Sequence, residues 1–349
     1  MPDKMTDTHF ALQSHLDLLY EHKPRRLAFR ATTLTGFQQW QQELHSELLQ
    51  VLGLAGKSPV PAAAEKLQTI DRGTYIETKY SLDVGEQVRT PMYLLTPKQA
   101  PPFKPILVFH GHEPSVQYIL GHYPDADIAR ANLAKDNNYA QALAQAGYLV
   151  CAIEQRGFSE RVTNDTSGGP FPRSCRHLSF EYMLEGRTLL GERCWDGLCA
   201  INYLQTRPDV QPGVMGCTGH SGGGATALWL SAIEPRITVA VISGYFCSFK
   251  ASILSMSHCE CNYVPGILEL AEMGDLAALI APRPFCVVHG EHDPIFPVHA
   301  TRVQFETVRR AYELRHAVEA CSLAIHPGAH AYHQELSQAW FSKWLSWKE

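Results

Sequence analysis

The sequence lacks any hydrophobic run that is long enough to cross a membrane. Its longer apolar stretches, such as residues 237–242, fall far short of the roughly 18 residues that a spanning helix requires. The chain opens on the polar residues Met-Pro-Asp-Lys-Met-Thr-Asp, without the apolar segment of a secretory signal. These two absences predict a cytoplasmic protein that has no membrane partner.

An excess of basic residues is also absent. The chain of 349 residues carries 30 Lys and Arg against 35 Asp and Glu, so its formal net charge is -5. A nucleic-acid-binding surface needs a basic patch or stripe, and we therefore expect no nucleic acid partner. Hydrophobic residues make up 45% of the chain, which is ample for a large core.

Metal-ligand motifs are missing as well. The ten cysteines are scattered, and several, such as Cys151, lie inside apolar runs typical of strands, which favours buried and reduced thiols. Cys259 and Cys261 flank a single residue, but no ligand spacing supports a redox or metal role there. His289 and His292 do not form the H-E-x-x-H pattern of a zinc hydrolase. The sequence thus predicts neither a metal nor an organic cofactor.

Two regions differ in their hydrophobic pattern. Residues 1–70 are predicted to form a peripheral helical extension, because apolar side chains between residues 37 and 49 recur at helical spacing. The Pro- and Ala-rich residues 58–64 are typical of a linker. Residues 71–349 then form the predicted main domain.

The main domain alternates between strand-like and helix-like segments. Residues 74–81 and 87–96 predict two early strands, arranged as a hairpin. Short apolar runs follow, separated by segments of helix length, and this alternation predicts a mostly parallel sheet with helices on both faces. Ligands bind such sheets at the carboxyl ends of the strands. The runs are residues 106–109, 149–153, 214–218, 239–243, 285–288 and 322–325.

A candidate nucleophile follows the run at residues 214–218. The sequence there is Gly219-His220-Ser221-Gly222-Gly223-Gly224, and a helical segment comes next. This is a G-x-S-x-G pattern between a strand and a helix, the context of a nucleophile elbow. Small flanking residues are needed because the sharp turn strains the backbone and crowds its neighbours. The pattern predicts Ser221 as the nucleophile.

A serine needs a base, and the base needs an acid that orients it. His330 lies in a Gly/Ala loop after the last apolar run, where the base is expected, whereas His326 and His333 flank this loop as alternatives. Asp293 follows the preceding run and comes directly before a proline, which favours an extended backbone there. Glu291 is the alternative acid, and we favour Asp293.

Two backbone N–H groups are expected to stabilise the negative oxygen of the reaction. One belongs to Gly222, directly after the nucleophile, at the start of the predicted helix. The other is expected in the stretch His110-Gly111-His112 that follows the run at residues 106–109, with His112 favoured and a neighbouring position left open.

Four further stretches resemble one protein family. Together with the G-x-S-x-G motif, the chain from about Trp40 onwards resembles α/β-hydrolases of the dienelactone-hydrolase-like group, near the bacterial acetyl xylan esterase-related proteins. Ser159 departs from the family pattern, in which a glycine is usual near that position. The stretches are residues 154–160, 193–196, 261–266 and 281–284.

The resemblance implies a serine esterase. True dienelactone hydrolases are similar in fold but use cysteine as nucleophile, so Ser221 argues for ester hydrolysis. The implied substrates are short acyl esters, among them acetyl groups on sugars, and no cofactor is implied. Residues 158–178 and 247–266 are expected to form a lid or pocket wall. The side chains considered for substrate binding are His110, Trp195, Tyr245 and Phe296.

Two rival functions remain open at this point. A serine peptidase similar to the prolyl oligopeptidase relatives usually carries a large propeller domain, which residues 1–70 are too short to form. A non-catalytic ligand receptor on a hydrolase fold is disfavoured by the intact Ser, Asp and His set. The sequence leaves open whether the chain forms a homo-oligomer.

Overall fold

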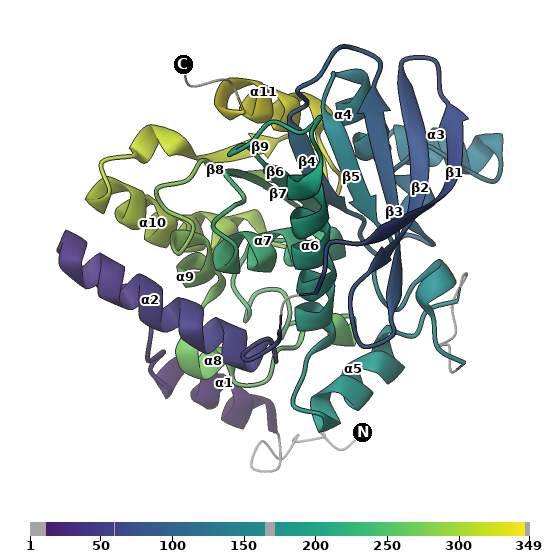
Figure 1. Cartoon of the computed structure of the whole chain (residues 1–349). Helices are drawn as coiled ribbons and strands as arrows, with labels where there is room; N and C mark the ends of the chain where they lie inside the picture. Colours follow the sequence, from purple (N-terminus) through teal and green to yellow (C-terminus); the bar gives the residue numbers. More distant parts are fainter. Residues whose placement is uncertain (1–11, 59, 165–171, 346–349) are drawn as a thin grey trace.

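The structure, a computed structural model, describes residues 12–58, 60–164 and 172–345. Its centre is a nine-stranded sheet in the order β1-β2-β3-β5-β4-β6-β7-β8-β9 (Figure 1). The predicted mostly parallel α/β architecture is confirmed, because β4 to β9 are parallel and only β1, β2 and β3 form an antiparallel edge, joined to β5. The strands are β1 (Ala64–Asp71), β2 (Tyr75–Asp83), β3 (Arg89–Pro97), β4 (Pro105–Phe109), β5 (Leu149–Ile153), β6 (Gly216–His220), β7 (Val239–Ser243), β8 (Phe285–Gly290) and β9 (Cys321–His326).

Helices cover both faces of this sheet. One face carries α6 and α7, and the opposite face carries α4 and α11 (Figure 1). The α-helices are α1 (Leu12–His22), α2 (Leu34–Val51), α3 (Ala126–Leu133), α4 (Tyr139–Gln145), α5 (Cys175–Leu184), α6 (Leu189–Thr206), α7 (Gly222–Ile233), α8 (Ile267–Leu270), α9 (Met273–Ala278), α10 (Val298–Leu314) and α11 (Gln334–Trp344). Short 3₁₀ helices are η2 (Val116–Tyr118), η3 (Ser159–Arg161), η4 (Glu260–Asn262) and η5 (Val318–Ala320).

The central strands are short and buried on both faces. Every residue of β4 is buried, with Leu107 and Phe109 in the core under α6 and α7, and Ile106 and Val108 in the core under α4 and α11. Side chains alternate between the two faces of a strand, so a strand covered on both faces reads as a continuous apolar run. This is why the sequence locates these strands well.

The N-terminal segment differs from its prediction in two ways. The strand β1 begins at Ala64, so residues 64–70 are not helical and the expected linker runs directly into the sheet. The helix α2 is not peripheral, because Phe37, Trp40 and Leu44 are buried in the main core beside α7. The predicted hairpin of the early strands is confirmed as the antiparallel pair β2 and β3.

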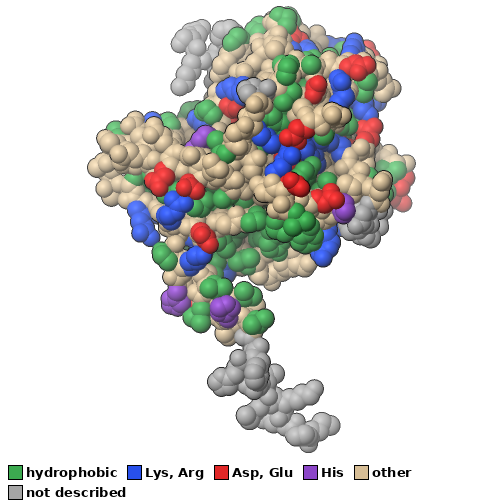
Figure 2. All heavy atoms as spheres, turned by 60° about the horizontal axis from the view of Figure 1, so that its bottom comes forward, with side chains coloured by type: hydrophobic (Ala, Val, Ile, Leu, Met, Phe, Trp, Pro, Cys, Tyr) green, Lys and Arg blue, Asp and Glu red, His purple; other side chains and the backbone are tan. Residues whose placement is uncertain are grey.

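Exposed hydrophobic side chains gather on the face that carries α1 and α5. This face is turned forward in Figure 2, where hydrophobic atoms form contiguous patches. Among the described helices, none has both the length and the apolar character that a membrane crossing needs. The exposed apolar residues on these two helices are Leu12, Leu16, Leu18, Leu19, Phe180, Met183 and Leu184.

We expect Phe37→Ala to lower the free energy of unfolding by about 3–5 kcal/mol, because it removes a buried aromatic ring that packs against Phe29 and Trp40. The neighbouring Gln38 is exposed, so Gln38→Ala is the matched control and is expected to stay within about 0.5 kcal/mol. Urea unfolding followed by circular dichroism measures both variants. Equal stability of the two would contradict the placement of α2 in the core.

Candidate active site

Ser221 lies on a sharp turn between β6 and α7. Its backbone has φ 54° and ψ -120°, a conformation that non-glycine residues rarely adopt, and its N–H donates to the Ser243 carbonyl (2.9 Å). Glycines make room for the turn. A Cβ atom on Gly219 would lie 2.3 Å from the Gly223 carbonyl oxygen, and one on Gly223 would lie 2.1 Å from that of Phe109. Only glycine fits at these two positions, which accounts for the motif.

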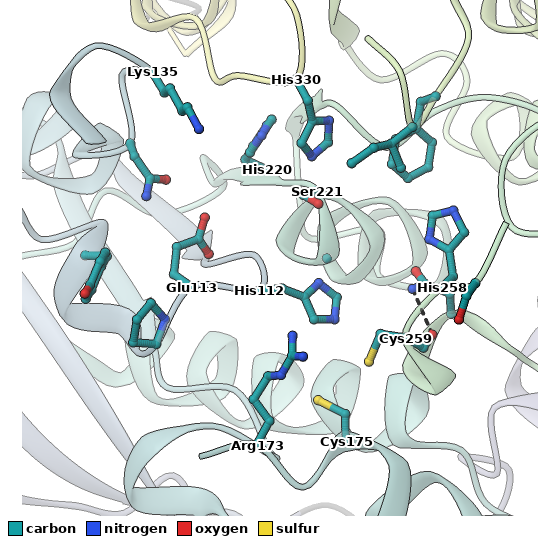
Figure 3. A pocket seen from close by; sticks show the side chains of 18 of the residues that line it. His112, Glu113, Lys135, Arg173, Cys175, His220, Ser221, His258, Cys259 and His330 are labelled. Atoms are coloured by element: carbon teal, nitrogen blue, oxygen red, sulfur yellow. Dashed lines mark hydrogen bonds between the residues drawn. The ribbon is translucent and has the colours of Figure 1, made fainter. Parts of the chain in front are cut away.

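His330 and Asp293 come together from the ends of neighbouring strands. Asp293 follows β8 and His330 follows β9, and these two strands pair in parallel register. The His330 Nδ1–H donates to Asp293 Oδ2 at 2.7 Å. Figure 3 shows the His330 ring directed towards the Ser221 hydroxyl. The structure thus brings together the three residues that the sequence singles out as nucleophile, base and acid.

The Asp293 carboxylate is buried, and both of its oxygens accept hydrogen bonds. Its second oxygen, Oδ1, accepts hydrogen bonds from the N–H groups of Ile295 (2.9 Å) and Phe296 (3.0 Å). Burial by itself raises the pKa of this carboxyl, but the hydrogen bond from His330 and those from the two N–H groups outweigh it, and the pKa lies below the usual range. Asp293 is therefore a carboxylate at neutral pH.

Aromatic rings hold the His330 imidazole from two sides. Phe296 stacks on it with a centroid distance of 5.9 Å, and His220 lies on another side at 4.6 Å. Burial keeps the pKa of His220 well below its usual range, so this ring is neutral. Its Nδ1 lies 3.0 Å from the Ser243 hydroxyl oxygen. His220 belongs to the G-H-S-G-G motif, but nothing in that motif indicates that its ring would pack against the base.

The alternative residues have other contacts. Glu291 is exposed to solvent, away from the position that Asp293 occupies. His326 is buried and accepts the Gly328 N–H, and His333 accepts the Leu336 N–H as the N-terminal cap of α11. The geometry therefore favours Asp293 and His330 over all three.

Ser221 and His330 open into a cavity of about 740 Å³. The cavity floor is formed by the start of α7 and the loop after β4. Its walls include residues 173–176 and 256–260, which belong to the two segments expected to form a lid or wall. Residues 165–171 of the first segment lie outside the described residues. The walls carry many polar and charged side chains, so the cavity suits a polar ligand.

Gly222 and His112, whose backbone N–H groups are expected to bind the negative oxygen, are neighbours in the structure. Gly222 is the first residue of α7, where an N–H has no acceptor within the helix. The His112 ring lies against it, because a Cβ atom on Gly222 would be 2.7 Å from this ring. Burial lowers the pKa of His112 to about 4, so its ring is neutral at neutral pH. Both residues line the cavity.

Of the four side chains considered for substrate binding, only Phe296 lines this cavity. His110 is fully buried, and its Nε2 accepts the Gln155 N–H (3.0 Å). Trp195 donates to the Val84 carbonyl (2.7 Å) on another part of the surface. Tyr245 is fully buried behind Phe296, with a centroid distance of 5.4 Å. These three predictions do not match the geometry, because the sequence does not reveal which way a buried aromatic ring faces.

Several residues of the cavity were not identified from the sequence. Lys135 comes from the turn between α3 and α4, and Glu113 comes from the loop after β4 (Figure 3). Arg173 lies just before α5, Arg176 lies in its first turn, and His258 comes from the segment before η4. Each lies in a loop or at the end of a helix without a motif, so no local pattern indicates its position.

The lowered pKa of Asp293 makes its contribution to stability depend on pH. This contribution is fully present above the pKa of an unfolded aspartate, about 3.9, and is lost as the pH falls through the lower pKa of the folded protein. Urea unfolding of the wild type and Asp293→Asn, from about pH 7 to about pH 3, measures the effect. We expect the advantage of the wild type to shrink below about pH 4. An advantage that is constant over this range would contradict the hydrogen-bonded carboxylate.

Two comparisons with known sequences cover most of the chain. The model of the Abhydrolase family matches residues 9–339. The chain is 30% identical over 260 residues to "Putative hydrolase YtaP" of Bacillus subtilis (strain 168), covering 73% of this chain and 82% of that protein.

Solved structures share the fold at lower identity. A "putative acetyl xylan esterase" from Bacteroides fragilis NCTC 9343 superposes with a TM-score of 0.80 at 16% identity, over 95% of both chains. A glucuronoyl esterase from Solibacter usitatus superposes with a TM-score of 0.65 at 17% identity, over 92% of this chain and 97% of that chain. The predicted α/β-hydrolase fold is confirmed. On the extent of the family match and the identity to its relative, the chain belongs to the Abhydrolase family.

Proposed function

We propose that this protein is a serine carboxylic-ester hydrolase that removes short acyl groups, with acetyl groups on sugars as the favoured substrates. The proposal depends above all on the 2.7 Å hydrogen bond from His330 to Asp293, beside a serine on a positive-φ turn in the same cavity. A serine, an imidazole and a buried carboxylate in this order form the apparatus of acyl transfer.

The first half of the reaction forms an acyl-enzyme. Because Asp293 accepts the Nδ1–H of His330, the imidazole presents its unprotonated Nε2 to the serine. The Ser221 oxygen attacks the ester carbonyl carbon while its proton passes to this Nε2. The resulting imidazolium then gives the proton to the alcohol oxygen as the carbon–oxygen bond breaks. The negative charge of Asp293 stabilises the imidazolium between these two events.

Negative charge develops on the carbonyl oxygen during the attack. The N–H groups of Gly222 and His112 are the proposed donors to this oxygen, and the start of α7 adds the positive end of a helix dipole. Losing one donor of this kind typically costs about 100- to 1000-fold in turnover. In the second half, water replaces Ser221 as the nucleophile, His330 again takes the proton, and the carboxylic acid leaves.

The cavity supports a polar alcohol as the leaving group. Lys135, Arg176 and Asn137 line it, and hydroxyl-rich sugars are suited to such donors and acceptors. The structures with a similar fold include proteins named acetyl xylan esterase and glucuronoyl esterase, whose names denote esters of carbohydrates. This likeness in fold supports sugar esters as the first substrates to test.

We expect the wild type to hydrolyse p-nitrophenyl acetate and acetylated xylo-oligosaccharides, and Ser221→Ala to lose on the order of a million-fold in kcat. A fluorophosphonate probe should label the wild type but not this variant. Ser231→Ala is the matched control, because Ser231 is a buried serine on the same helix α7 and should leave labelling intact.

Two outcomes would contradict the proposal. Turnover of peptide p-nitroanilides without any ester hydrolysis would indicate a peptidase. No labelling and no turnover of either class, in a folded protein, would indicate a non-catalytic receptor.

The assignment of the base is tested by comparing three histidine variants. His330→Ala should reduce kcat on the order of a million-fold, because no other described imidazole is bonded to Asp293. His326→Ala and His333→Ala are the controls, since both rings have other partners. Steady-state kinetics with p-nitrophenyl acetate measure all three. Retained activity in His330→Ala would transfer the role to one of the other two histidines.

A further inference from the structure

Soft donor atoms from three distant segments meet on the wall of the cavity. His112 follows β4, Cys175 is the first residue of α5, and Cys259 and Cys261 flank the start of η4. One donor atom from each of His112, Cys175 and Cys259 lies within 4.8 Å of the other two. The Cys261 sulfur is 3.4 Å from His112 Nε2 and 3.2 Å from the Cys259 sulfur. Figure 3 shows the first three side chains directed towards one another.

A buried positive charge lies beside these thiols. Arg193 is 2% exposed, and its Nη2 lies 3.3 Å from the Cys175 sulfur. Its remaining hydrogen bonds go to the carbonyl oxygen of Arg156, and within the described ranges no carboxylate forms an ion pair with it. The interactions that raise the pKa of this guanidinium come from the three thiols of the cluster. A buried guanidinium requires a compensating negative charge, which a thiolate supplies.

We propose that His112, Cys175, Cys259 and Cys261 form a binding site for a thiophilic divalent cation, with zinc as the favoured ion. Binding of the ion is independent of the ester hydrolase proposal, whereas its positioning role beside Gly222 rests on that proposal. Three cysteines and one histidine are a set that zinc binds in proteins, with zinc–sulfur bonds of about 2.3 Å. Three thiolates, one divalent cation and the guanidinium of Arg193 together carry no net charge, so the buried site is electrically balanced.

The geometry requires only small adjustments. Tetrahedral zinc with such bonds places its donor atoms roughly 3.5–3.8 Å apart. The measured separations of 3.2 Å, 3.4 Å and up to 4.8 Å lie around this range. Side-chain rotations at Cys259 and Cys175 close the difference, and both residues line the cavity, which gives the ion a route of entry. Binding releases the thiol protons to solvent.

The proposed ion would connect the floor of the cavity to its walls. The His112 ring lies against Gly222, and the N–H groups of these two residues are the proposed donors to the reacting oxygen. A cation held by this ring and by the thiols of α5 and η4 would therefore fix the loop after β4 relative to both walls. We infer a positioning role for the ion rather than a role in the chemical steps.

Metal binding by the intact protein tests the proposal. The reduced full-length chain, stripped with a chelator, is titrated with zinc against a competing chromophoric chelator. A parallel titration with cadmium records the charge-transfer absorption of cadmium–thiolate bonds. We expect one equivalent of either ion, with the cadmium–thiolate absorption saturating at the same ratio. Circular dichroism checks that each protein is folded.

Single substitutions locate the site. Cys175→Ser and Cys259→Ser should each lower the affinity for zinc by at least about 100-fold, because each removes a ligand. Cys321→Ser is the matched control, since Cys321 is a partly exposed thiol like Cys259 but lies on β9, and it should bind as the wild type does. The two cluster variants are close in size to cysteine and lie in different segments, so failure of one to fold leaves the other as the test.

Three results would overturn the proposal. The first is that the reduced wild type binds no stoichiometric zinc. The second is that zinc binding is unchanged in Cys175→Ser and Cys259→Ser. The third is that the purified protein is lighter by two hydrogens and peptide mapping locates a disulfide within the cluster, with no zinc bound after its reduction.

Discussion

The strained turn at Ser221 is the constraint on which the rest of the site depends. A non-glycine residue with φ 54° and ψ -120° is held in place by the β6 strand before it, the α7 helix after it, and the hydrogen bond to Ser243. The glycines allow α7 to approach the end of β4 so closely that any Cβ atom on Gly223 would overlap the Phe109 carbonyl. This approach lifts the serine hydroxyl clear of the backbone and aims the start of α7 at the reacting centre.

Parallel register then supplies the partners of the serine. The carboxyl ends of β6, β7, β8 and β9 lie at one edge of the sheet, so the loops that follow them share a cavity. Asp293 is fixed by two backbone N–H groups in addition to His330, so its direction does not depend on the imidazole alone. The ring itself is confined between Phe296 and His220. Little reorganisation is then needed during the reaction, which is the main physical source of catalysis by such sites.

Elements and site residues that depend on a local sequence pattern could be predicted. Positions that are set by tertiary packing could not. The positions of Asp293 and His330 could be inferred because each follows a strand that reads as an apolar run, of which β8 is buried throughout and β9 is mostly half-buried. The strand β1 was missed because it is an edge strand with mostly exposed residues and no alternation. Tyr245 lies in the turn after β7 and is fully buried. No sequence pattern indicates that this turn directs its ring away from the cavity. Cys175 lies far in sequence from the thiols it meets, so no ligand spacing could reveal the cluster.

The most direct test of the central claim is to trap the covalent intermediate. The protein is mixed with p-nitrophenyl acetate, quenched in acid during turnover, digested, and mapped by mass spectrometry. We expect one acetyl group per chain, located on the hydroxyl of Ser221. An acetyl group on another side chain, such as the thiol of Cys259, or turnover without any acetylated peptide, would contradict it.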